Sequence, residues 1–255
     1  MSESIHMTQS TPGSTSDYTR PRSSDYTRRD VLKLAAIGLA ATAGVGAEPA
    51  TRPIDVAVLL AEHNTLIDFA GPWEVLSSAV YASCPGFNVY SVAASRAPVL
   101  CDDGRGGDTT TRPISGLSVV PDYTFKDAPQ PRVILVGGQS GADEPQRLEW
   151  LRHAAAKTDF VTSVCTGAFV LGKSGLLNGR NATTNRNAYD SFEKAFPAAH
   201  LVRGVRFVES GSIVTATGLT AGIDLALHLT EKFWGREAAL KIAEYEEWPR
   251  DYRKV

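Results

Sequence analysis

Short apolar runs alternate with longer amphipathic stretches along the chain after residue 50. A strand places every second side chain on one face and a helix every third or fourth, so the spacing separates the two kinds of element. It predicts the strands 54–60, 87–93, 132–136 and 160–164, and the helices 72–81, 143–157 and 166–173. Such alternation favours an α/β fold whose central sheet is mostly parallel and is covered by helices on both faces.

Two later segments depart from this alternation. Residues 95–125 are rich in glycine and proline, so we expect an antiparallel excursion of hairpins and loops there in place of a helix. A Ser-Gly pair at 210–211 separates the short strands 206–209 and 212–215 and predicts a β-hairpin. A helix at 220–234 is expected after the hairpin.

The first fifty residues have a different character. Residues 1–30 are rich in Ser, Thr, Pro and Arg, and the sequence SDYTR occurs in them twice, so we expect disorder. The Arg28-Arg29 pair, the mildly apolar run 34–43 and the small residues that end at Ala47 resemble a twin-arginine export signal. The alternative is a chance arginine pair before an alanine-rich helix.

The order of these elements favours the signal. We expect cleavage after Ala47, a mature α/β domain over 48–255, and a periplasmic or secreted location. The apolar run is too short for a membrane span, so no stable membrane anchor is expected once the signal is removed.

Composition narrows the class of partner. The 255 residues are 43% hydrophobic and carry a formal net charge of −2, without a basic stripe of the kind that nucleic-acid binding requires. A small-molecule partner is therefore expected. The histidines lack the paired spacing of a zinc site, so no metal is predicted. Of the three cysteines, Cys84 and Cys101 flank a predicted strand; whether they form a disulfide is left open.

The third cysteine carries the chemistry. The predicted strand 160–164 stops at Cys165, and Thr166-Gly167-Ala168 turns directly into a helix, which is the pattern of a nucleophile elbow. The amide donors and the dipole of such a helix predict a lowered thiol pKa and a reactive thiolate. The alternative is a small buried core residue. The small residues after Cys165 favour the nucleophile, because they leave room for a ligand above the sulfur.

Several sequence blocks together resemble the ThiJ/PfpI superfamily, which is class I glutamine amidotransferase-like, and in particular its isocyanide hydratase branch. The resemblance covers about 54–246 and implies a flavodoxin-like three-layer sandwich, a homodimer and no cofactor. The blocks are LIDFAGPWEV at 66–75, VGG at 136–138, SVCTGA at 163–168, GLL at 175–177 with ATT at 182–184, and TGLTAGID at 217–224.

Carried onto matching positions, the resemblance implies that Cys165 is the nucleophile, Asp68 its acidic partner and Thr166 a residue that shapes the pocket. The backbone amides of Gly138, beside Gly137, and of Thr166 would stabilise charge on the substrate. The implied reaction adds water to an isonitrile through a thioimidate and releases an N-formamide. Asp68 has a plainer alternative, since an acidic residue that lies just before a Gly-Pro helix start, with two residues between, favours the helix dipole.

Departures from the family pattern put the substrate in doubt more than the fold. Asn185 and Arg186 stand where many relatives of this branch have a histidine and an aromatic residue, and Arg186 would favour an anionic substrate. His63 stands where relatives tend to have glycine, and is either a pocket residue or a solvated loop histidine. Trp73 either lines the pocket or belongs to the core. Thr166 replaces the histidine of the protease-like branch, which counts against a peptidase.

Two non-enzymatic functions remain as alternatives. The same domain serves as a ligand-binding sensor in some transcription regulators, so a non-catalytic periplasmic binding protein is one. The other is a redox or stress-related protein, which requires an accessible thiol of low pKa at Cys165.

Overall fold

The computed structural model of the protein describes residues 52–102 and 116–251. The predicted twin-arginine signal at 1–47 lies outside these residues. Within them, no helix is at once long enough and apolar enough to cross a bilayer.

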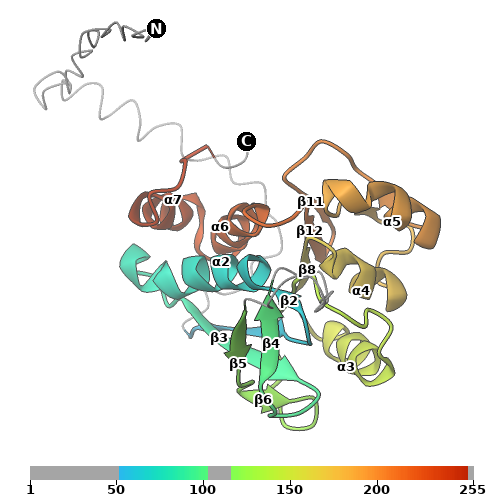
Figure 1. The fold of residues 1–255 in the computed structure, drawn as a ribbon. Helices are drawn as coiled ribbons and strands as arrows, with labels where there is room; N and C mark the ends of the chain where they lie inside the picture. Colours follow the sequence, from blue (N-terminus) through green and yellow to red (C-terminus); the bar gives the residue numbers. More distant parts are fainter. Residues whose placement is uncertain (1–51, 103–115, 252–255) are drawn as a thin grey trace, which may run out of the picture. The chain divides into compact units, whose positions relative to one another are not determined.

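A seven-stranded sheet forms the centre of the domain (Figure 1). The hairpin strand β11 is antiparallel to β12, and every other neighbouring pair is parallel, which confirms the predicted mostly parallel sheet. In spatial order the strands are β11 (Phe207–Ser210), β12 (Ile213–Ala216), β8 (Phe160–Val164), β7 (Val133–Val136), β1 (Ile54–Leu59), β3 (Phe87–Ala93) and β6 (Tyr123–Thr124).

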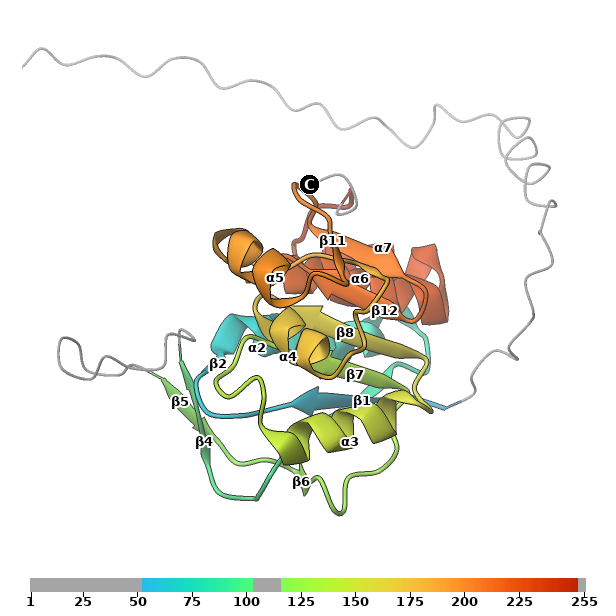
Figure 2. The ribbon, with the colours of Figure 1, turned by 90° about the vertical axis from the view of Figure 1, so that its right-hand side faces the viewer.

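Helices cover both faces of this sheet (Figures 1 and 2). Along β7, Val133 and Leu135 pack into one apolar cluster, whereas Ile134 and Val136 pack into the other. The α/β three-layer arrangement expected from the sequence is confirmed. The first cluster includes α2 (Leu66–Ser77), the 3-10 helix η1 (Ser78–Ala82), α6 (Ala221–Trp234) and α7 (Arg236–Tyr245); the second includes α3 (Pro145–Ala155), α4 (Gly167–Lys173) and α5 (Tyr189–Ala195).

Two small sheets lie outside the central one. Strand β4 (Val99–Asp102) pairs with β5 (Leu117–Val119) in the antiparallel manner expected for this part of the chain, and with the two-residue β2 (Asn64–Thr65) in parallel (Figure 2). A second short pair joins β9 (Asn181–Ala182) and β10 (His200–Leu201).

The helix predicted at 72–81 starts earlier than expected. It begins at Leu66, so Pro72 lies inside α2 and Asp68 lies in its first turn. A proline within a helix removes one backbone hydrogen bond, and here its ring has a packing role. A Cβ on Gly222 of α6 would come within 2.9 Å of the Pro72 ring, so the Gly-Pro pair marks a close helix–helix contact and not a helix start.

The disulfide that the sequence left open is not formed, and all three cysteines are free. The Cys84 thiol donates to the carbonyl of Ala79 at 3.3 Å, at the end of η1. Cys101 is buried on β4, where its thiol faces the carbonyl of Val99.

The close packing of α4 on β7 predicts a large cost for a small substitution. A Cβ added at Gly167 would lie 2.1 Å from the carbonyl oxygen of Val136, and backbone cannot yield as a side chain can. We expect Gly167→Ala to lower the free energy of unfolding by about 3 kcal/mol. Gly179→Ala is the control, because Gly179 has a positive φ of 69° but no neighbour within 4 Å of an added Cβ. Urea titration should show a loss of about 1 kcal/mol for that control; equal losses in the two variants would contradict the prediction.

Candidate active site

Cys165 occupies a strained turn between β8 and α4. Its φ is +60°, in the left-handed region that a non-glycine residue rarely adopts. The turn is held from two sides: the Cys165 N–H donates to the carbonyl of Ala216 at 3.1 Å, and the Thr184 hydroxyl donates to the Cys165 carbonyl at 2.9 Å. The strand–turn–helix geometry expected of an elbow is therefore present.

Asp68 faces Cys165 from the first turn of α2. Its side chain is fully buried, and the Cys165 thiol forms a hydrogen bond with it. The two carboxylate oxygens each accept a backbone amide, Oδ2 from Gly138 at 2.9 Å and Oδ1 from Leu219 at 3.0 Å. The carboxylate thus joins three loops that are far apart in the sequence.

Asn185 approaches the sulfur from a third direction. Its Oδ1 accepts the N–H of Asn187 at 2.9 Å as the cap of the 3-10 helix η2 (Arg186–Ala188), and its Nδ2 donates to the Cys165 Sγ at 3.5 Å. Because the oxygen is engaged with backbone, the NH₂ group is the end that faces the thiol. A side-chain amide at this position supplies a hydrogen-bond donor but cannot carry a proton to or from a substrate.

Residues 55–232 match the DJ-1/PfpI family. The chain belongs to this family.

The chain is similar to an enzyme, to a transcriptional regulator and to a family member of known structure. The chain is 34% identical over 192 residues to the isonitrile hydratase of Pseudomonas putida, which covers 73% of this chain and 75% of that protein. It is 28% identical over 203 residues to the HTH-type transcriptional regulator GbdR of Pseudomonas aeruginosa, which covers 78% of this chain but 52% of the regulator. A ThiJ/PfpI family protein from Pseudomonas syringae has a similar crystal structure, with a TM-score of 0.65, 25% identity, and coverage of 83% of this chain and 84% of that one.

The predicted thiolate at the DJ-1/PfpI elbow is wrong for the resting state. Burial, followed by the charge of Asp68, raises the pKa of the Cys165 thiol to about 11, although the Thr166 amide and Asn185 act in the opposite direction. Burial also raises the pKa of Asp68 to about 6, against the lowering effect of the Gly138 and Leu219 amides and the thiol. Between these two values a neutral thiol donates its hydrogen bond to an ionised carboxylate.

The Gly138 amide has a different partner from the one expected. Sequence reasoning assigned it to charge developing on a substrate, together with the Thr166 amide. In this structure it donates to Asp68, while the Thr166 amide donates to the Cys165 sulfur. Glycine at 138 permits this close approach, because a Cβ there would lie 2.6 Å from the Thr166 hydroxyl. At Gly137 a Cβ would lie 2.7 Å from the Asn64 side chain.

The other predicted pocket residues lie in separate surroundings. His63, with a positive φ of 57°, places its Nδ1 2.6 Å from a carboxylate oxygen of Asp102 on β4. Trp73 is half-buried and packs against the apolar cluster under α2, as its core alternative predicts. Arg186 is exposed at the start of η2 and lines a cavity that Cys165 does not line. Of these four candidates, only Asn185 contacts the sulfur.

Sequence reasoning missed the loop after β12. A Cβ on Gly218 would lie 3.2 Å from the Cys165 Cβ, and Leu219, with a positive φ of 53°, supplies the second amide to Asp68. The signal was available, because β12 is parallel to β8 and the carboxyl ends of parallel strands meet at one edge. The block that contains both residues was recognised, but no contact with Asp68 was inferred from it.

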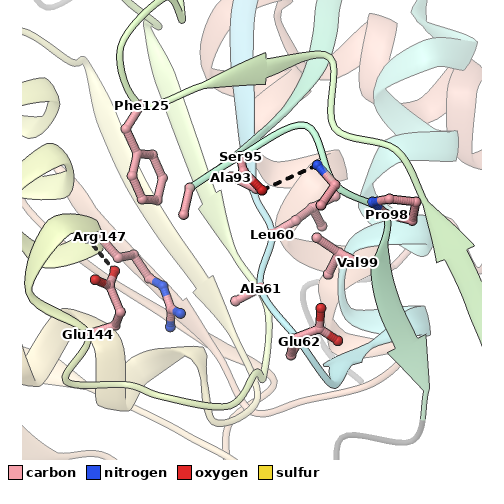
Figure 3. Close-up of a pocket in the computed structure, with 12 residues that line it drawn as sticks. Leu60, Ala61, Glu62, Ala93, Ser95, Pro98, Val99, Phe125, Glu144 and Arg147 are labelled. Carbon is pink, nitrogen blue, oxygen red and sulfur yellow. Dashed lines mark hydrogen bonds between the residues drawn. The ribbon is translucent and has the colours of Figure 1, made fainter.

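A cavity of about 190 Å³ lies beyond the ends of β1 and β3, and Cys165 does not line it (Figure 3). The buried Arg147 of α3 reaches its wall, where Nη1 donates to the carbonyls of Ser140 at 2.9 Å and Gly141 at 2.7 Å. Arg147 therefore fixes the loop that follows Gly138. Within the described ranges, no group of three or more His, Cys, Asp or Glu side chains is arranged to hold a metal ion.

Two substitutions are expected to move the thiol pKa in opposite directions. Asp68→Asn removes the negative charge that disfavours the thiolate and should lower the pKa of Cys165. Asn185→Ala removes a donor to the sulfur and should raise it. The rate of iodoacetamide modification of Cys165 against pH, followed by mass spectrometry of its peptide, measures both. A midpoint of the rate-against-pH curve near pH 8.5 in the unmodified chain, the ordinary pKa of a free thiol, would contradict this electrostatic picture.

Proposed function

We propose that this protein hydrates small isonitriles to N-formamides, with Cys165 as the nucleophile and Asp68 as the group that moves the proton. The observation that carries the proposal is the buried thiol that donates to an ionised carboxylate at a nucleophile elbow. The 34% identity to an isonitrile hydratase supports it. A thiol and a carboxylate that share one mobile proton suit a substrate whose carbon must gain a sulfur and a hydrogen together.

In the first step the Cys165 sulfur bonds to the isonitrile carbon while Asp68 takes the thiol proton. Asp68 then delivers that proton to the same carbon, and the carbon–nitrogen triple bond becomes a double bond. The product of the step is a thioimidate, R–N=CH–S–Cys165, in which every atom of the thiol and the isonitrile is retained. The high resting pKa of the thiol is compatible with this step, because the base lies within hydrogen-bonding contact of the proton.

In the second step water adds across the carbon–nitrogen double bond, with its oxygen on carbon and a proton on nitrogen. The carbon–sulfur bond then breaks, and the hydroxyl proton returns through Asp68 to the leaving sulfur. This releases R–NH–CHO and restores the thiol. The Thr166 amide and the Asn185 Nδ2, which both face the sulfur, stabilise negative charge on it as it attacks and as it leaves.

A ligand-binding protein without catalysis is the second candidate. The similarity to the regulator GbdR and the protonated resting thiol favour it. A peroxide-sensing role is less well supported, because that chemistry requires an accessible thiol of low pKa, whereas Cys165 is 7% exposed. Export through a twin-arginine signal and assembly as a homodimer remain predictions from the sequence.

Removal of either reacting group should abolish or strongly reduce turnover. We expect Cys165→Ala to be inactive and Asp68→Asn to lower kcat/KM by about a hundredfold to ten-thousandfold, the range that general acid–base catalysis contributes. The assay is formation of the N-formamide from a neutral isonitrile such as cyclohexyl isocyanide. Cys84→Ala is the matched control, because Cys84 is a free thiol outside the site. Retained activity in Cys165→Ala would overturn the role of the thiol, and no activity in the unmodified protein would overturn the proposal in favour of the binding protein.

The pH dependence follows from the carboxyl group. Asp68 must be ionised to take the thiol proton, and burial raises its pKa from 3.8 to about 6. We therefore expect log(kcat/KM) to fall with a slope of one as the pH drops below about 6, and to level off above that value. Steady-state rates with an uncharged isonitrile test this, since the substrate itself does not titrate. An acidic limb of the pH profile with an apparent pKa near 4 would mean that Asp68 is not the titrating base.

A further inference from the structure

A cavity of about 370 Å³ lies beside η2, which follows Asn185 directly along the chain. Two of its lining residues directly follow or precede residues that contact Cys165. Arg186 follows Asn185, whose Nδ2 is 3.5 Å from the sulfur, and Thr217 precedes Gly218, which packs against the Cys165 Cβ. The lining residues are Arg186, Tyr189, Gly204, Val205, Arg206 and Thr217.

Adjacent residues on two segments of the chain border the cavity and the sulfur. Consecutive Cα atoms are about 3.8 Å apart, and on each segment no residue lies between the cavity wall and the residue at the sulfur. The volume equals that of about a dozen liquid water molecules. A compact organic substituent therefore fits in the cavity.

The charges around the cavity are unequally compensated. The Arg206 guanidinium is paired with the buried Asp224, with Nε to Oδ2 at 2.8 Å, and also contacts the Thr220 hydroxyl. The Arg186 side chain has no hydrogen-bond or ion-pair partner within residues 52–102 and 116–251. Among the described residues, Arg186 therefore places a positive charge without a partner at the cavity.

The neighbouring Arg203 does not change this balance. It forms ion pairs with Asp190 at 3.2 Å and Glu193 at 2.5 Å, and its guanidinium lies 5.0 Å from the ring centre of Tyr189. Arg203 is therefore compensated by carboxylates, whereas Arg186 is not. The first is a natural control for the second.

We infer that this cavity binds a carboxylate substituent of the substrate through Arg186, so that the preferred substrates are isonitriles that carry an acid group. The inference rests on the proposed hydration at Cys165. A guanidinium offers two parallel N–H groups to the two oxygens of a carboxylate, which fixes the orientation of the bound group as well as adding affinity. Anchoring the acid at Arg186 would direct the rest of a short molecule toward Asn185 and the sulfur.

The test compares isocyanoacetate with its methyl ester, which differ in charge at one end. We expect kcat/KM of the unmodified protein to be about tenfold higher for the acid, the effect of one charge-assisted hydrogen bond at a partly solvated site. Arg186→Gln should bring this ratio close to one by slowing the acid alone, and Arg186→Lys should keep part of the preference. Arg203→Gln, the control, should leave the ratio unchanged.

The outcomes separate the two proposals. Turnover of the methyl ester tests the chemistry at Cys165, whereas the acid-to-ester ratio and its dependence on Arg186 test the subsite. A ratio near one in the unmodified protein, or a preference that survives Arg186→Gln, overturns the subsite.

A binding measurement remains decisive for the subsite if neither isonitrile is turned over. Calorimetry with N-formylglycine and its methyl ester then replaces the kinetics. About tenfold tighter binding of the acid, lost in Arg186→Gln, supports the subsite although the hydration fails. Equal binding of acid and ester overturns it.

Discussion

A carboxylate buried against a thiol is the constraint on which the site depends. Asp68 is fully buried, and an ionised carboxylate in such a place is stable only when hydrogen-bond donors replace the water it has lost. The amides of Gly138 and Leu219 and the thiol of Cys165 do so. Burial of the thiol and, after it, the negative charge that these contacts stabilise on Asp68 keep the sulfur protonated. The resting state of the thiol therefore depends on its neighbour as well as on the turn that presents it.

The parallel sheet brings the residues of this site together. Strands β7, β8 and β12 are adjacent and parallel, so their carboxyl ends deliver Gly138, Cys165 and Leu219 to one edge. The first turn of α2 brings Asp68 to the same edge. Close approach of these backbones requires glycine at 167, where a Cβ would collide with the Val136 carbonyl, and is eased by glycine at 138, where a Cβ would lie against the Thr166 hydroxyl. The local glycine pattern and the global strand order thus support the same geometry.

The sequence allowed prediction of the features that have a local period or a local turn signal. The strand 160–164, the elbow at Cys165 and the parallel sheet were of this kind, and the quoted blocks indicated the family. The start of α2 was misjudged, because Pro72 resembles a helix start until its ring is seen to pack on Gly222. Helix α7 was not predicted, although it begins immediately after Gly235 at the end of α6. The charge effect of Asp68 on the thiol pKa and the hydrogen bond from the Leu219 amide to Asp68 link residues that are far apart in the sequence, which periodicity cannot show.

Two of the donors that hold Asp68 are backbone amides, and this has a consequence for substitutions at the residues that supply them. The side chain of Leu219 is 47% exposed, and only its N–H contacts the acid. A substitution at this position therefore changes a solvent-exposed side chain and keeps the N–H that stabilises the ionised carboxyl group.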